Sequence, residues 1–172
     1  RVRKIRCVCG DCNSGWLSAL QTQCKPTILR LINRESFYFD AKSQEALAIW
    51  CAMLSIIAEY IEDRNAGIAY EDCHYFYKTK RIPAHWRLWI GHLPVTVPFV
   101  DYAHNCMASV EKDRPEAIAL YDPNKPNTQT TTIRVGDAIV HFMSSSEPVA
   151  QRGIRRWKWH ALGGKLRQVW PI

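Results

Sequence analysis

Two cysteines near the amino end have the spacing of a metal site. Cys9 and Cys12 are separated by two residues. At this spacing two thiolates can bind one ion, and a structural zinc takes four ligands arranged as a tetrahedron. The pair therefore offers half of a Zn²⁺ site. Asn13 follows directly, with an amide that can cap a helix or bind Mg²⁺. The alternative is a pair of core cysteines beside a turn, because free cysteine is often buried.

The surrounding sequence resembles a known motif. Val-Cys-Gly-Asp-Cys-Asn-Ser-Gly-Trp-Leu at residues 8–17, followed by Lys25-Pro26 and Leu29, resembles the second half of an HNH-type endonuclease motif. Weaker similarities follow at residues 89–91 and 169–171. The resemblance implies a ββα-metal fold, a structural Zn²⁺ on the cysteines, and a catalytic Mg²⁺ or Mn²⁺. It also implies metal-assisted hydrolysis of DNA phosphodiesters, with Asn13 holding the ion or positioning the loop.

The chain departs from the family pattern in the residue that activates water. The family has an upstream Cys-x-x-Cys and an acidic-His pair before the second cysteine pair. None of the six histidines has that context, and the nearest acidic cluster, Glu71–His74, comes later in the chain. We therefore expect a truncated or degenerate member: an HNH-type endonuclease as the full-length protein, and incomplete or inactive as this fragment. Cys73 and His74 within that cluster are a second, weaker candidate pair of zinc ligands.

The charge of the chain favours a polyanionic partner. The 172 residues carry a net charge of +7, which suits nucleic acid, expected to be DNA, or an acidic membrane surface, although many globular proteins are also basic. Two clusters carry this charge, the second with tryptophans interleaved that could stack on bases. In both, the alternative is a solvated edge. The predicted nucleic-acid-binding residues are Arg1, Arg3, Lys4, Arg6, Arg152, Arg155, Arg156 and Lys158.

The cysteine and hydropathy patterns suggest a reducing compartment and no membrane span. Seven cysteines form no evident disulfide framework, so we expect a cytoplasmic protein with free or metal-bound thiols. The longest apolar segment, Ala46–Ile61, contains Ser55 and Glu59. It is also shorter than the roughly 20 residues that cross a bilayer. We predict a buried helix there.

The elements expected to position these residues give an α+β fold. Residues 1–34 form the knuckle and helix of the HNH-like motif, and residues 35–172 form a domain in which a long buried helix packs on an antiparallel sheet. The apolar stripe over residues 14–32 predicts a helix that Pro26 kinks or divides. Ser43 is the predicted cap of a helix over residues 44–63 that ends near Asn65 or Gly67. Residues 68–77 predict a further short helix or turn.

The sheet is expected over about residues 86–172. Runs of β-type residues predict strands over 86–93, 97–102, 106–110, 116–121, 130–143 and 168–170. The longest of these runs contains a hairpin turn at Gly136-Asp137. His92, His104 and His141 lie in or beside apolar strands, and we interpret each as a hydrogen-bonded structural histidine.

Three functions are compatible with the sequence. The first is an HNH-type nuclease with Cys9 and Cys12 as a metal half-site. The second is a non-catalytic DNA- or RNA-binding domain that keeps the knuckle and the basic surface. The third is a protein-interaction module in which the zinc knuckle is purely structural. We predict the first and keep the other two as alternatives.

Overall fold

The computed structural model describes residues 7–36, 38–61, 66–92, 102–111, 115–119, 122, 124–156 and 166–171. Along the chain the elements are α1 (Gly10–Ser14), α2 (Trp16–Ile32), α3 (Ala41–Glu59), α4 (Tyr70–Thr79), β1 (Arg87–His92), β2 (Tyr102–Met107), α5 (Pro115–Ala119), β3 (Thr128–Val135), β4 (Ala138–Ser145), α6 (Pro148–Arg156) and β5 (Arg167–Trp170). The mixture of helices and an antiparallel sheet confirms the predicted α+β class.

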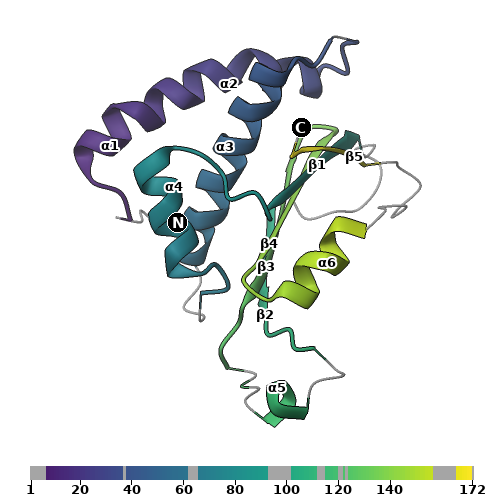
Figure 1. The fold of residues 1–172 in the computed structure, drawn as a ribbon. Coiled ribbons are helices and arrows are strands. Elements are labelled where there is room, and N and C mark those ends of the chain that lie inside the picture. Colours follow the sequence, from purple (N-terminus) through teal and green to yellow (C-terminus); the bar gives the residue numbers. More distant parts are fainter. Residues whose placement is uncertain are drawn as a thin grey trace.

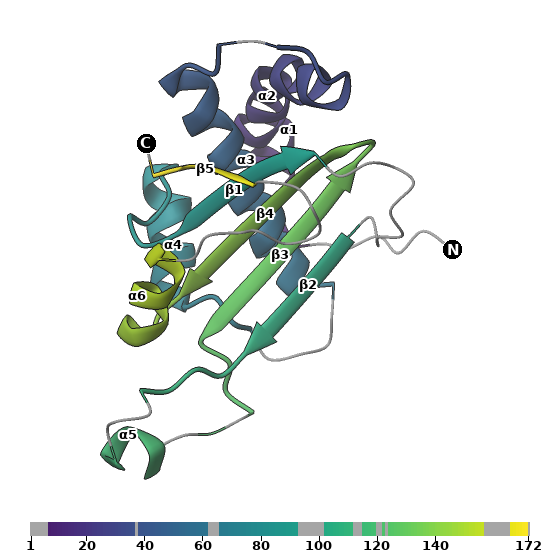
Figure 2. The same cartoon turned by 90° about the vertical axis from the view of Figure 1, so that its right-hand side faces the viewer.

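Five described strands form one antiparallel sheet in the order β2-β3-β4-β1-β5 (Figure 2). Strands β3 and β4 are joined by the predicted turn at Gly136 and Asp137, where Gly136 has a φ of 59°. A residue without a Cβ adopts this left-handed conformation at little cost, which favours the tight hairpin. The predicted hairpin and the closing strand are therefore confirmed.

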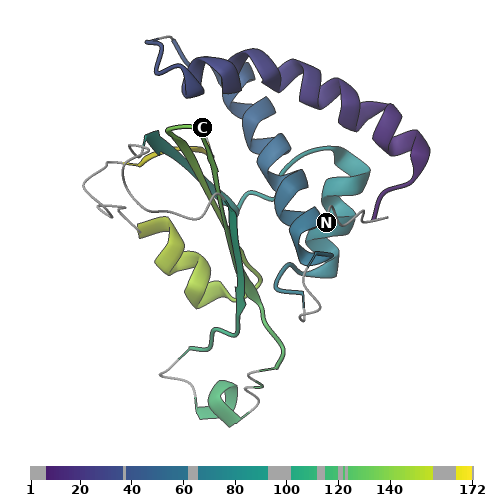
Figure 3. The same ribbon diagram turned by 180° about the vertical axis from the view of Figure 1, so that it is seen from behind.

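Helices lie on both faces of the sheet. Figures 1 and 3 show α2, α3 and α4 on one side and α6 on the other. The larger core lies on the first side, where α3 packs against apolar residues of the sheet such as Leu88 and Phe142. The smaller cluster, Trp89, Met143 and Ile154, lies between the sheet and α6. Alternate residues of β1 and β4 thus serve opposite faces, as the two-residue period of a strand requires.

Helix α3 is the predicted buried helix, with different ends. It begins one turn early because the Asp40 carboxylate accepts a hydrogen bond from the Ser43 backbone N–H at 2.7 Å. Asp40 rather than Ser43 is therefore the N-cap. The helix ends at Glu59 and not near residue 63, with Tyr60 at its C-cap. Within the part of the chain that the structure describes, no helix has the length and apolar character needed to cross a bilayer.

The predicted division of the helix at Pro26 is wrong. Helix α2 runs from Trp16 to Ile32 with Pro26 inside it, and the interruption comes instead at Gly15, between α1 and α2. Pro26 is exposed on the outer side of the helix, while buried residues such as Leu20 and Leu31 contribute to the core shared with α3. Tertiary packing therefore keeps the helix continuous despite the lost backbone hydrogen bond.

Two segments of the second half are helical where strands or an edge segment were expected. The predicted strand over residues 116–121 is wrong, because Pro115–Ala119 forms α5. The basic segment beginning at Arg152 belongs to α6, which begins at Pro148 and buries Ile154 against the sheet. Proline is favoured at the first helical position, which explains both starts. The predicted strand over 97–102 lies mostly outside the described residues, and β2 starts at Tyr102.

Candidate functional site

The cysteine pair forms the first turn of α1. Cys9 is the N-cap of this helix, and its sulfur accepts a hydrogen bond from the Cys12 N–H at 3.4 Å. This backbone hydrogen bond, followed by one from the Cys12 side chain, lowers the pKa of the exposed Cys9 thiol. Because the thiolate is the metal-binding form, the turn favours the state that a metal requires. Two sulfurs are therefore held together on one side of an exposed turn.

Asn13 lies within this turn and does not open the helix. Its backbone N–H donates to the Cys9 carbonyl at 3.0 Å, inside the helix Gly10–Ser14. The capping role expected for Asn13 is therefore taken by the Cys9 thiol. The Asn13 side chain is exposed beside the cysteine pair. Trp16, which follows, packs on Phe76 of α4 with ring centroids 5.8 Å apart, so it attaches the turn to the main core.

The predicted nucleic-acid-binding residues that the structure describes lie away from the cysteine pair. Arg1, Arg3, Lys4, Arg6 and Lys158 lie outside the described residues. Arg152, Arg155 and Arg156 are exposed on α6, and Arg152 forms an ion pair with Glu111 at 2.8 Å. Figures 1 and 3 place α1 and α6 on opposite sides of the sheet.

Cys73 and His74 do not form a ligand pair. The His74 ring is exposed and stacks on Tyr70 at 5.9 Å. Burial, with the negative charges of Glu59 and Asp72, raises the pKa of the half-buried Cys73 thiol to about 11. Neighbours on a helix point in different directions, and only residues three or four apart share a face.

A different Cys–His pair meets a carboxylate between α3 and β2. Glu59, His104 and Cys106 are the only described group of three potential metal-ligand residues that come together. The Cys106 sulfur lies 3.3 Å from His104 Nε2 and 3.6 Å from Glu59 Oε1. His104 Nε2 lies 3.8 Å from the same carboxylate oxygen, and the His104 and Glu59 side chains are 2% and 7% exposed. Carboxylate, imidazole and thiol can all bind zinc.

The Glu59 carboxylate is fixed by the chain that follows α3. Its Oε1 accepts hydrogen bonds from the backbone N–H groups of Gly67 at 2.9 Å and Ile68 at 3.0 Å. A Cβ on Gly67 would lie 2.8 Å from the Thr128 carbonyl oxygen and 3.1 Å from the Cys106 sulfur. Only glycine therefore lets this backbone approach so closely. Burial raises the pKa of Glu59, partly offset by these hydrogen bonds.

The sequence contained a local signal for part of this group. His104 and Cys106 are two residues apart on β2, so they share one face of the sheet. The expectation of a hydrogen-bonded His104 is confirmed by Thr131, whose hydroxyl lies 2.9 Å from Nδ1. His92 and His141 likewise have partners, the Leu31 carbonyl and the Thr132 hydroxyl. Glu59 could not be found in this way, because it lies 45 residues before His104.

An acidic-His pair also forms away from the cysteines. Asp72 Oδ2 lies 2.9 Å from His85 Nε2 and accepts a hydrogen bond from Trp86 Nε1 at 3.0 Å. These contacts attach the segment before β1 to α4. The pair comes after the cysteines in the chain, so it does not follow the order of the HNH motif. Asp72 of this pair holds the indole N–H of the fully buried Trp86.

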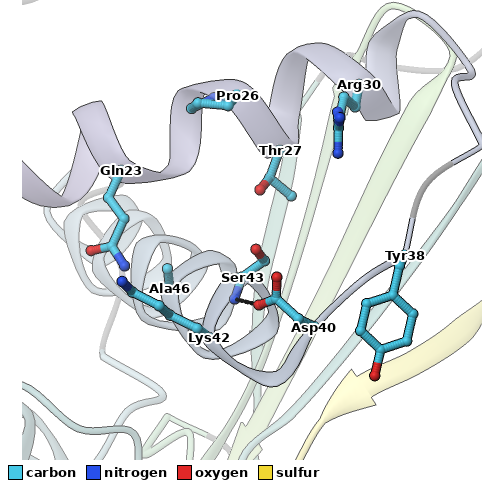
Figure 4. A pocket seen from close by; sticks show the side chains of 9 residues that line it. All are labelled: Gln23, Pro26, Thr27, Arg30, Tyr38, Asp40, Lys42, Ser43 and Ala46. Carbon is cyan, nitrogen blue, oxygen red and sulfur yellow. Dashed lines mark hydrogen bonds between the residues drawn. The ribbon is translucent and has the colours of Figure 1, made fainter.

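A surface pocket of about 400 Å³ between α2 and the start of α3 offers less chemistry (Figure 4). Its lining is mixed, and its acidic residue Asp40 is already the N-cap of α3. The hydrogen bond from the Ser43 N–H lowers the pKa of Asp40. Figure 4 shows Arg30 and Tyr38 separated along its rim rather than directed at one point. This pocket therefore lacks a convergent group of reactive side chains.

Comparison with known proteins adds no relative: no family model matches the chain, and neither curated proteins nor solved structures give a match.

Proposed function

We propose that this protein acts on nucleic acid and that Cys9 and Cys12 are half of the structural zinc site of an HNH-type nuclease centre. The observation that carries the proposal is the turn at the start of α1. There a Cys-x-x-Cys pair shares a hydrogen-bonded turn, and the pKa of Cys9 is lowered. Cytosolic cysteines at this spacing typically bind metal or act in redox chemistry.

The donor set fits zinc but is incomplete among the described residues. No third potential ligand joins Cys9 and Cys12 there, whereas structural zinc takes four ligands. The proposal therefore requires two ligands and a general-base histidine from another part of the protein. In HNH-type chemistry a bound Mg²⁺ or Mn²⁺ would stabilise the charge on the scissile phosphate. The exposed Asn13 amide beside the pair is the group of this chain that we assign to positioning that centre.

Metal analysis of the protein encoded by the complete gene tests this site. The Cys9→Ser/Cys12→Ser protein should lose one zinc per chain, because serine does not replace a thiolate ligand, and it should lose plasmid nicking in Mg²⁺ or Mn²⁺. Asn13→Ala should keep the zinc and lower the nicking rate. Cys7→Ser is the matched control, since Cys7 is a neighbouring thiol that is not part of the Cys9–Cys12 pair. Unchanged zinc content in the double variant, or no nicking by the intact protein, would contradict the proposal.

A second observation favours binding to nucleic acid independently of cleavage. Arg155 and Arg156 are exposed in the last turn of α6. Burial and the like charge of Arg155 lower the pKa of Arg87 on the adjacent sheet. Concentrated guanidinium groups attract phosphate, and each neutralised phosphate contributes about 0.9 to the slope of log K against log salt concentration for duplex DNA. The observation supports the alternative of a non-catalytic binding domain.

The salt dependence of binding to a short DNA duplex tests this surface. We expect Arg155→Gln/Arg156→Gln to weaken binding at low salt and to reduce the slope by about 0.9 for each phosphate that the variant no longer neutralises. Lys125→Gln removes an exposed charge from the turn before β3, outside α6, and should leave the slope unchanged. An effect of Lys125→Gln about half as large as that of the double variant would show that only net charge matters and that α6 does not bind the DNA.

A further inference from the structure

We infer that Glu59, His104 and Cys106 form a second metal site, specific for a divalent cation such as Zn²⁺ that accepts nitrogen, sulfur and oxygen together. The site is separate from the Cys9–Cys12 turn. It is formed by the end of α3 and by one face of β2, and the imidazole and carboxylate side chains are nearly buried.

The separations of the ligand atoms match the size of such an ion. The sides of the triangle formed by Cys106 Sγ, His104 Nε2 and Glu59 Oε1 measure 3.3, 3.6 and 3.8 Å. Ligand distances of about 2.0–2.3 Å in tetrahedral zinc place neighbouring ligand atoms roughly 3.3–3.8 Å apart. A point equidistant from the three atoms lies about 2.1 Å from each. An ion can therefore bind all three with small movements.

A chain of buried hydrogen bonds fixes the tautomer of His104. Gln129 Nε2 donates to the Ser144 hydroxyl at 3.2 Å, so its Oε1 is the acceptor for the Thr131 hydroxyl at 2.8 Å. A hydroxyl has one proton, so Thr131 must accept from Nδ1–H of His104. The lone pair of His104 is therefore on Nε2, the nitrogen on the side of Cys106. Metal-binding histidines usually have their other nitrogen held in this way.

This chain of hydrogen bonds is deeply buried. Gln129, Thr131 and Ser144 are each at most 1% exposed, on the paired strands β3 and β4. Burying polar groups costs stability unless every group is paired. This series of hydrogen bonds ends at His104. There a cation would be bound by the imidazole lone pair, the thiolate and the carboxylate. Glu59 Oε1 already accepts hydrogen bonds from two backbone N–H groups, so the ion would bind this carboxylate by replacing one of them or through Oε2.

Zinc titration of the Cys9→Ser/Cys12→Ser protein tests the inference without interference from the other pair. We expect this protein to bind one Zn²⁺ per chain and to unfold at a higher temperature when Zn²⁺ is present. With Co²⁺ it should show thiolate-to-cobalt charge-transfer absorption, since one ligand is sulfur. If it takes up no Zn²⁺ or gives no such absorption, the inference is wrong.

Substitutions in the same background assign the ligands. Cys106→Ser should abolish the charge-transfer absorption, and Glu59→Gln should lose Zn²⁺ binding while still accepting from Gly67 and Ile68. Thr131→Val, which removes the hydroxyl bonded to His104 Nδ1, should weaken binding about 10–100-fold. Thr130→Val is its matched control, because Thr130 faces the other side of the same strand. If Glu59→Gln and Cys106→Ser bind Zn²⁺ as tightly as their parent, the group is a structural hydrogen-bond network only.

Discussion

Trp86→Ala should lower the free energy of unfolding by about 3–5 kcal/mol, the range for removing a large aromatic side chain from a core. Trp86 is completely buried and contacts Phe142 edge to face, with centroids 5.2 Å apart. Its Nε1–H also donates to Asp72. The substitution therefore leaves a cavity in the larger core and also removes one donor from a half-buried carboxylate. Urea unfolding at neutral pH measures the loss, with the slope as a check on the unfolded state.

Two further variants separate packing from hydrogen bonding at this position. Trp86→Phe keeps most of the aromatic volume but loses the donor to Asp72, so we expect a loss of about 1.5–3 kcal/mol. Tyr38→Ala is the matched control, because Tyr38 is 88% exposed and its removal should change stability by less than about 0.5 kcal/mol. Equal losses for Trp86→Phe and Trp86→Ala would mean that the ring itself contributes little to the core.

Sequence patterns predicted the elements whose signals are local. The glycine at position 136 specifies the β3–β4 hairpin by its left-handed conformation, and the continuous apolar character of α3 indicates a buried helix. Predictions from local sequence patterns were wrong where tertiary packing determines which element forms. Pro26 does not break α2, because the opposite side of that helix is buried in the core. The tryptophan-rich basic segment from Arg152 begins as a helix because one apolar residue, Ile154, suffices to dock it.

The two candidate metal sites also differ in whether a local sequence pattern reveals them. The Cys9–Cys12 pair is visible in the sequence because one turn of chain holds both sulfurs. The second group requires a helix end and a strand that only the fold brings together, and its hydrogen-bond support comes from two further strands. A His-x-Cys spacing on a strand is a useful signal, because its two side chains must share a face. The partner carboxylate had no such signal.

The stability of the protein should fall by about 3 kcal/mol between pH 6.5 and pH 4 because of His141 alone. His141 lies on the side of β4 near Trp89, with ring centroids 5.8 Å apart, and burial lowers its pKa to about 4 from the usual 6.5. Above pH 6.5 both the folded and the unfolded protein hold it neutral, so it contributes no pH dependence. Below pH 6.5 only the unfolded chain binds the proton, which costs the folded state about 1.4 kcal/mol per pH unit until the pH reaches about 4.

Unfolding measured by urea at a series of pH values gives this slope directly. His141→Gln can still hydrogen-bond Thr132 but does not titrate, so its stability should fall less steeply over this interval than that of the parent. Other groups, such as carboxylates paired in the folded state, contribute equally to both proteins, and the difference between the two curves isolates His141. His74→Gln is the matched control, since this exposed ring should leave the slope unchanged. Parallel curves for the parent and His141→Gln would show that His141 accepts its proton in the folded protein as readily as in the unfolded chain.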